Sequence, residues 1–197
     1  MTWNLALSIA LFGFVTAVTP GPNNTMLLSL GANFGARRTL PYINGIMVGL
    51  ATTLSTLSVG FGAVLTAFPF IYTVLKVVGF SYIVYLAFKI VRSTKSVEAK
   101  KASYIGFVKS IGFQFINPKA WIVGATLATT MIPVSEGFVP TAISILIFLI
   151  VTWPGAFIWA ALGQGLAQFL SNDRRRAMFN WTSAILLVVS MIPAIFH

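Results

Sequence analysis

Long apolar stretches separated by short polar or basic segments dominate the chain. Four stretches carry no charged side chain: residues 1–36, 39–75, 137–172 and 177–197. A helix needs about 20 mostly apolar residues to cross a bilayer. The pattern predicts an all-α membrane protein with six transmembrane helices, at about 3–29, 41–66, 69–91, 106–131, 140–170 and 178–196. The third of these contains Lys76, and the fourth contains Lys109 and Lys119.

Composition supports a lipid environment for most of the chain. Hydrophobic residues make up 57% of it and charged residues only 8%, against roughly 25% charged residues in a soluble domain. So few charges would not cover the surface of a water-soluble protein. We therefore expect membrane lipid, rather than water, to surround most of the molecule.

The residues of metal and thiol chemistry are nearly missing. The chain has no cysteine, one histidine at position 197, and three acidic residues: Glu98, Glu136 and Asp173. Disulfides, thiol nucleophiles and Cys-ligated metals are thereby excluded, and no His/Asp/Glu cluster suits a metal ion. We expect no metal and no cofactor.

The net charge of +10 marks one side of the membrane rather than a nucleic-acid partner. Basic residues lie in the first, third and fifth loops between the expected helices: Arg37 and Arg38; Arg92, Lys95, Lys100 and Lys101; Arg174, Arg175 and Arg176. The short second and fourth loops carry none. Since basic residues collect on the cytoplasmic side, the odd loops are predicted to be cytoplasmic and both termini periplasmic.

The third loop, about residues 92–104, also divides the chain near its middle. We expect one transmembrane domain over residues 1–197, built from half-repeats at about 1–92 and 105–197 joined by this basic cytoplasmic loop. With three helices per half, the second half inserts upside down relative to the first. This 3+3 inverted repeat is typical of transporters.

Each half begins with a helix that the sequence interrupts. The first span contains Thr19-Pro20-Gly21-Pro22-Asn23-Asn24, and the fourth contains Gln114-Phe115-Ile116-Asn117-Pro118-Lys119. Pro20 and Pro118 are 98 residues apart, almost half the chain. Proline removes a backbone donor and fixes φ, and irregular backbone at membrane depth requires cover from protein or a water-filled cavity. A kink that serves packing alone is the alternative.

The polar residues at these breaks are the candidate substrate-binding residues. Amide side chains donate and accept hydrogen bonds, so they suit a zwitterion and equally suit capping freed carbonyls. Half-helix N-termini after the prolines present partial positive charge to a carboxylate. The candidate set is Pro20, Gly21, Pro22, Asn23, Asn24, Gln114, Asn117, Pro118 and Lys119.

Two lysines and two glycine-containing motifs each have two interpretations. Lys119 either attracts a substrate carboxylate or lies at the cytoplasmic interface, and Lys76 either snorkels to the periplasmic surface or adds a cavity charge. Gly45 and Gly49 indicate close helix packing, within the monomer or in a homodimer. Trp153-Pro154-Gly155 predicts a kink in the fifth span or a gating element.

Together these segments resemble a known family. Thr19 to Asn24 resembles the first signature of the LysE/RhtB family of amino-acid exporters, and Asn117-Pro118-Lys119 is similar to its second. The stretch from Lys76 to Lys89 is similar to the family's third hydrophobic segment. The first motif also resembles that of the cysteine/O-acetylserine exporter branch. The resemblance covers nearly the whole chain and implies proton-driven efflux across a bacterial inner membrane.

One departure from the family narrows the expected substrate. Members that export basic amino acids carry an acidic residue within the membrane, whereas all three acids here fall in loops. We therefore expect a neutral or zwitterionic amino acid or derivative, with cysteine and O-acetylserine as candidates. The alternatives are an ion channel, a structural membrane subunit, or an intramembrane enzyme using a Ser–Lys pair.

Overall fold

The computed structural model describes residues 2–61, 67, 69–92, 106–167 and 169–189, and these ranges contain helices but no strand. The long helices, in chain order, are α1 (Trp3–Val18), α2 (Pro22–Phe34), α3 (Ala36–Thr56), α5 (Pro69–Arg92), α6 (Phe107–Ile116), α7 (Pro118–Thr130), α8 (Phe138–Leu166) and α9 (Asp173–Val189). Short helical turns lie at η1 (Leu57–Phe61), η2 (Val134–Glu136) and η3 (Phe169–Ser171). The expectation of an all-α protein is confirmed for these ranges.

Both expected breaks are present. The first falls between α1 and α2, whose axes differ by 56°, and the second falls at Asn117 between α6 and α7. Each new helix begins with a proline, which is favoured at the first helical position because its missing N–H would have no partner there.

One expectation about the connections between helices was wrong. Arg37 and Arg38 do not form a loop, because α3 begins at Ala36 and places them in its first turn. Gly35 alone connects α2 to α3, with a φ of 86° that favours glycine. Helix α8 continues past Pro154, because a proline removes one backbone donor without always ending a helix. The expected kink at Pro154 stays a prediction.

Length and composition identify only some helices as membrane spans. Within the described residues, Ala36–Gly60 and Phe138–Leu166 are each long and apolar enough to cross a bilayer, and the bent pair α1–α2 is a third if taken as one span. The arrangement with six spans stays a prediction. The central basic loop and the C-terminal end of the sixth expected span lie outside the described residues.

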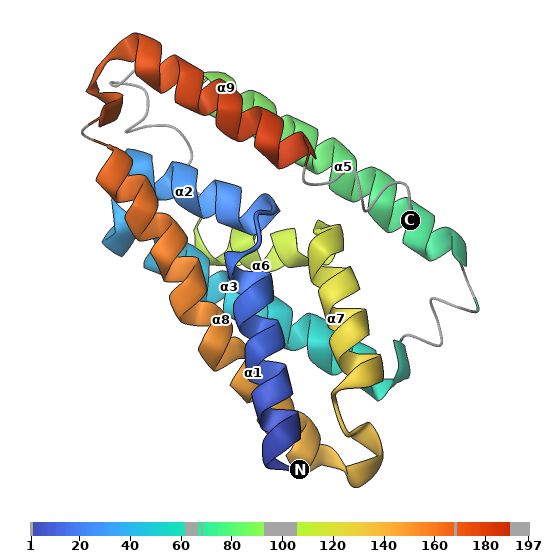
Figure 1. Ribbon diagram of the computed structural model, residues 1–197. Helices are drawn as coiled ribbons and strands as arrows, with labels where there is room; N and C mark the ends of the chain where they lie inside the picture. Colours follow the sequence, from blue (N-terminus) through green and yellow to red (C-terminus); the bar gives the residue numbers. More distant parts are fainter. Residues whose placement is uncertain (1, 62–66, 68, 93–105, 168, 190–197) are drawn as a thin grey trace.

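The two halves of the chain interlock. The broken helices α1 and α2 pack on α8, while α6 and α7 pack on α3. Helices α5 and α9 lie side by side across one side of the molecule (Figure 1) and contact α6 and α2, respectively. Each half therefore supplies the long helix against which the other half's broken helix packs.

Glycines permit this close approach. A Cβ atom on Gly45 would collide with Ser110 and the Phe107 carbonyl, and one on Gly49 would collide with Gln114. The Gly45–Gly49 pair thus packs on α6 inside the monomer, so it gives no support to the homodimer alternative. Oligomeric state stays a prediction.

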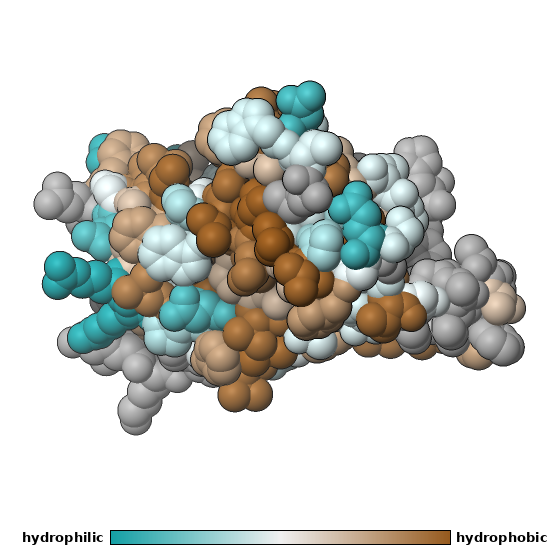
Figure 2. All heavy atoms as spheres, turned by 90° about the horizontal axis from the view of Figure 1, so that it is seen from below, coloured by the Kyte–Doolittle hydropathy of each residue, from teal (hydrophilic) through white to brown (hydrophobic). Residues whose placement is uncertain are grey.

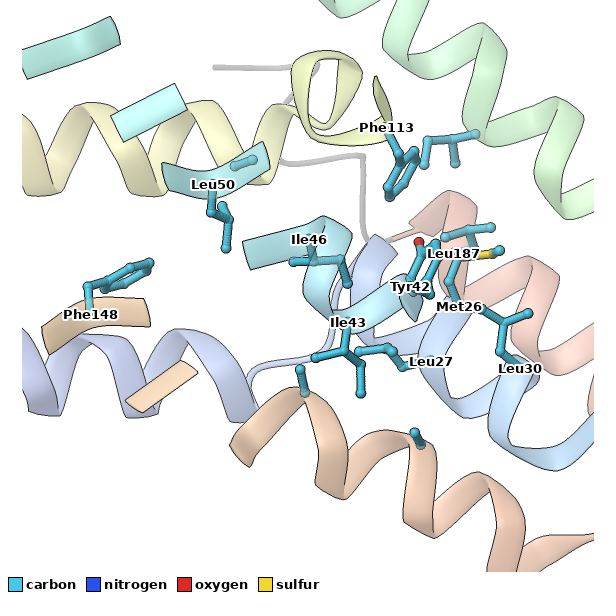
Figure 3. Close-up of a cluster of buried hydrophobic side chains, with 14 of the residues drawn as sticks. Met26, Leu27, Leu30, Tyr42, Ile43, Ile46, Leu50, Phe113, Phe148 and Leu187 are labelled. Atoms are coloured by element: carbon cyan, nitrogen blue, oxygen red, sulfur yellow. The ribbon is translucent and has the colours of Figure 1, made fainter. Parts of the chain in front are cut away.

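Buried apolar side chains from several helices fill the centre. Figure 3 shows Leu27 of α2 and Ile43 of α3 among the labelled residues of this cluster, together with Phe148 of α8. All three are at most 1% exposed. This core fixes α3 between the two broken helices, where a cavity described below opens.

The outer surface is rich in large apolar side chains. Phe138 is 83% exposed and Ile150 is 68% exposed, and exposed large apolar side chains occur on α1, α3, α5, α6, α7, α8 and α9. Figure 2 shows apolar side chains crossing the middle of this face, with hydrophilic ones along its left edge and in smaller groups at the top and to the right. Such extensive apolar exposure is typical of a lipid-facing surface.

Candidate functional site

The first break exposes the carbonyl end of α1. The helix ends at Val18, and Thr19 is extended, with φ −69° and ψ 128°. The last carbonyls of a helix have no partner within the helix, so at membrane depth other groups must satisfy them. Polar side chains from α2, α7 and α8 do so here.

Asn24 is one of these capping groups. Its Nδ2 donates to the carbonyl oxygens of Ala17 and Thr19, both at 2.8 Å, and Trp159 Nε1 of α8 donates to the same Ala17 oxygen at 3.1 Å. Asn24 is only 7% exposed. Of the two roles considered for this amide, the structure places it in the capping one.

Lys119 is the second capping group, and it comes from the other half of the chain. Its Nζ donates to the carbonyl oxygens of Thr19 at 2.8 Å, Thr16 at 3.3 Å and Pro20 at 3.4 Å. Gly21 lies directly beside this side chain: a Cβ there would sit 2.8 Å from Lys119 Cδ. The lysine therefore joins the start of α7 to the end of α1.

The second break is capped locally. Asn117 is extended, and its Oδ1 accepts a hydrogen bond from Lys119 N at 3.1 Å, which makes it the N-cap of α7. Trp121 Nε1 donates to the Phe115 carbonyl oxygen at 2.8 Å, satisfying the end of α6. Asn117 is 2% exposed, so its carboxamide is committed to this turn.

A reciprocal amide pair connects the two breaks. Asn23 Nδ2 donates to Gln114 Oε1 at 2.9 Å, and Gln114 Nε2 donates to Asn23 Oδ1 at 3.1 Å. Gln114 is completely buried and donates also to the Ser110 carbonyl oxygen at 3.2 Å. Two candidate residues that are 91 positions apart thus satisfy each other.

A cavity of about 60 Å³ lies where these elements meet, large enough for a few water molecules. Of the predicted residues, Gly21, Asn23, Asn24, Asn117 and Lys119 line it. The other predicted residues do not line it: Pro20, Pro22, Gln114 and Pro118. They instead shape the breaks or, for Gln114, hold Asn23.

The remaining wall was not predicted from the sequence. It comes from the ends of α1 and α2, from α3 and α8, and from α7: Thr16, Ala17, Leu27, Ile46, Met47, Leu50, Ala120, Val123, Phe148, Thr152 and Ala156. Phe148, Thr152 and Ala156 follow a four-residue spacing, which puts them on one helix face. That spacing does not distinguish a cavity wall from ordinary core, so the sequence offered only the nearby Gly45, Gly49 and Gly155 as signals.

The charged side chain in the described lining of the cavity is positive. Lys119 is the cation among its described lining residues, and none of those residues is acidic. Glu136 lies on η2 and Asp173 begins α9, while Glu98 and the side chain of Lys76 fall outside the described residues. A cation, amides and backbone carbonyls suit a small molecule with a carboxylate and an ammonium group.

Metal chemistry has no candidate site in the described ranges. No group of three or more His, Cys, Asp or Glu side chains there could hold an ion.

Known proteins similar to this chain are membrane exporters. The profile of the family described as LysE type translocator matches residues 14–194. The cysteine/O-acetylserine efflux protein of Klebsiella pneumoniae subsp. pneumoniae is 33% identical over 191 residues, which cover 95% of each chain. The proteins of that name from Salmonella typhimurium and Escherichia coli K12 are 34% and 32% identical, over 95% of this chain and 96% of theirs. No solved structure matches.

Proposed function

Because the chain belongs to the LysE type translocator family, we propose that it exports small neutral amino acids or their derivatives from the cytoplasm, with cysteine and O-acetylserine as first candidates. The observation that carries this proposal is the cavity between the two broken helices. It presents Lys119 and two amides of the first break, and its described lining contains no acidic group.

The chemistry of the cavity favours a zwitterion. A carboxylate can pair with the Lys119 ammonium, whereas a substrate with a cationic side chain would add positive charge beside it and find no counter-ion in a low-dielectric site. The apolar wall from α3 and α8 suits a short uncharged side chain. These features match the substrates named for the relatives of this chain.

The packing supports a 3+3 inverted repeat as the architecture of the exporter. Each broken helix rests on the long helix of the opposite half, α1 and α2 on α8, and α6 and α7 on α3. In inverted-repeat transporters the substrate binds at such an interface, and one half rocks against the other to alternate access. We propose the same movement here, across a bacterial inner membrane.

A proton gradient is the proposed driving force. The described cavity lining contains no carboxylate that could carry the proton, so the proposal assigns the coupling group to no residue. Its experimental signature is uptake that stops when a protonophore collapses the gradient.

Two of the three alternatives considered from the sequence, the intramembrane enzyme and the ion channel, differ from an exporter in specific properties. No serine lines the cavity among the described residues, and its two threonine hydroxyls, those of Thr16 and Thr152, donate to the carbonyl oxygens of Gly13 and Phe148 rather than to Lys119. An ion channel would conduct without saturating in amino-acid concentration, which separates it from an exporter.

Uptake into inside-out membrane vesicles tests the function. With an imposed proton gradient, labelled cysteine and O-acetylserine should enter saturably, and lysine and glutamate should not. The Lys119→Met variant should lose most of this uptake at matched expression. Lys109→Met is the control, because Lys109 is exposed on α6 away from the cavity lining. Absence of uptake for every amino acid, with the protein inserted, would refute the proposal.

A further inference from the structure

The carbonyl oxygens of Thr16, Thr19 and Pro20 converge on a single point, which the Lys119 Nζ occupies. A primary ammonium carries three N–H donors, and three acceptors lie within 2.8 to 3.4 Å of this nitrogen. The partial negative charge at the C-terminal end of a helix adds to the attraction. The end of α1 is therefore built as a site for a primary ammonium.

An amino acid brings the same chemical group into the same cavity. Its α-ammonium is a primary ammonium with three donors, and three backbone carbonyls cannot distinguish it from the end of a lysine. Thr16 and Lys119 line one cavity, so a bound solute meets the lysine and the first of the three carbonyl residues. The Thr19 and Pro20 carbonyls lie just beyond the lining, at the point that the Lys119 Nζ reaches. Thr19 and Pro20 are exposed, so the rest of the protein does not cover these carbonyls completely.

The rest of the cavity offers the solute's ammonium no better partner. None of its described lining residues is acidic. The Asn24 amide donates to Ala17 and Thr19, and the Asn23 amide is paired with Gln114. The three carbonyls at the α1 end converge on one point, so together they offer a positive charge more acceptors than any single amide or hydroxyl oxygen of the lining does.

We propose that the end of α1 is the ammonium subsite of the transporter, and that Lys119 occupies it as a surrogate when no solute is bound. This inference rests on the proposed export of amino acids. It adds which groups of the site bind the ammonium and the carboxylate of the solute. The α-ammonium of the solute takes the place of Lys119 Nζ on the carbonyls, and the released lysine turns to the solute's carboxylate.

The exchange keeps every charge paired. Lys119 leaves the three carbonyls when the carboxylate of the solute becomes its new partner. At the same time the ammonium of the solute replaces the lysine on those carbonyls. Unpaired charge at membrane depth is costly, so a solute that supplies only one of the two groups cannot complete the exchange. Recognition then requires a free ammonium and a free carboxylate on the same molecule.

Three matched solutes test this requirement on the unaltered protein. N-acetylcysteine lacks the ammonium of cysteine, and cysteamine lacks its carboxylate. Their competition against labelled cysteine uptake is measured in inside-out vesicles, and their effect on thermal stability in detergent. We expect each analogue to compete at least about tenfold more weakly than cysteine, because each leaves one charged group of the site without its partner.

The Lys119→Met variant separates the two subsites. Without the lysine, cysteamine should bind more tightly than it does to the wild type, since it no longer competes for the carbonyls, while cysteine should bind more weakly. N-acetylcysteine should stay weak, and Lys109→Met should behave as the wild type.

Equal competition by N-acetylcysteine and cysteine in the wild type would overturn the ammonium subsite while leaving the exporter proposal intact. Weaker binding of cysteamine to the Lys119→Met variant than to the wild type would also overturn the ammonium subsite. If the wild-type protein neither binds nor transports any amino acid, the exporter proposal fails and this inference fails with it.

Discussion

Amide side chains at the two breaks divide into those that cap backbone and those that face each other. Asn24 and Asn117 are committed to carbonyl and N–H groups of the broken helices. Asn23 is half-buried, lines the cavity and pairs with Gln114. Substitutions at these residues should therefore separate stability from transport.

Replacing Asn24 with alanine should destabilise the fold. It removes one hydrogen bond to each of the Ala17 and Thr19 carbonyl oxygens, which keep Trp159 Nε1 and Lys119 Nζ as donors, and a hydrogen bond contributes about 0.5–1.5 kcal/mol net. The midpoint of thermal unfolding in detergent should fall clearly for Asn24→Ala. Asn33→Ala is the control, because Asn33 bonds only within α2, to Ser29. Equal midpoints for the two variants would contradict the capping role.

The amide pair should show energetic coupling. Asn23→Ala leaves the buried Gln114 carboxamide without its partner, and Gln114→Leu leaves Asn23 without one, so each single change should cost stability. The double variant should lose less than the two losses combined, with a coupling energy of about 0.5–3 kcal/mol. Unfolding midpoints of the four proteins measure this, and strict additivity would mean that the pair contributes nothing.

Gly21 should matter for transport because of its neighbour. A methyl group there would sit 2.8 Å from Lys119 Cδ and 3.0 Å from its Nζ, so Gly21→Ala should displace the lysine and raise the KM for uptake. Gly112→Ala on α6 meets nothing within 4 Å and should leave the KM unchanged. An unchanged KM in Gly21→Ala would argue against a fixed lysine position.

Close packing between helices depends on glycines whose neighbours are backbone atoms. A Cβ on Gly31 of α2 would collide with the Ala160 carbonyl of α8, and one on Gly163 of α8 would collide with the Leu28 carbonyl of α2. Backbone cannot move aside as a flexible side chain can. The distance between helices α2 and α8 therefore cannot increase without breaking this contact.

Two glycines of α8, Gly163 and Gly165, should respond oppositely to replacement by alanine. Gly163→Ala must push α2 and α8 apart, so folded protein and its thermal midpoint should both decrease. Gly165→Ala meets nothing within 4 Å and should be neutral or stabilising by about 0.5–1 kcal/mol, as expected for alanine in a helix interior. Fluorescence size-exclusion profiles after heating report both effects, and similar losses in the two variants would contradict the packing argument.

The sequence predicted the helix breaks well because their cause is local. Proline constrains its own φ and removes its own donor, so Pro20, Pro22 and Pro118 mark the breaks without any knowledge of their surroundings. The same local property does not by itself end a helix, since α8 continues through Pro154. The first turn of α3 was mistaken for a loop because its arginines are charged.

The cavity wall was not predictable for a different reason. Ile46, Leu50 and Phe148 are apolar residues on helical faces, which is also the pattern of core residues. Only the packing of α3 and α8 against opposite halves decides which of them border empty space. Likewise, the partner of Lys119 is a set of backbone carbonyls, and no side-chain motif records such a partner.

At the scale of the whole molecule, basic residues lie at particular helix ends. Arg37 and Arg38 open α3, Arg174 and Arg175 open α9, and Arg92 ends α5. The N-terminal end of α1 and the turn between α7 and α8 lie at the opposite end of the molecule from the start of α9 (Figure 1). This distribution supports the proposed orientation, with the arginine-bearing ends in the cytoplasm.

Single cysteines should report this orientation directly, since the chain has none of its own. A membrane-impermeant maleimide should label Ser135→Cys, in exposed η2, from outside intact cells. Asn172→Cys, exposed just before α9, should be labelled only after permeabilisation. The reverse pattern would invert the proposed topology.

The apolar composition of the cavity wall has a consequence for the divergence of this family. In the proposed site, the charged groups of the solute meet backbone carbonyls and Lys119, whose contacts do not involve the apolar wall. Met47, Leu50 and Val123 can therefore drift in size between species without disturbing charge recognition. New cargo would then arise through changes in a few apolar side chains, and wall volume would be the property to compare among relatives with different cargo.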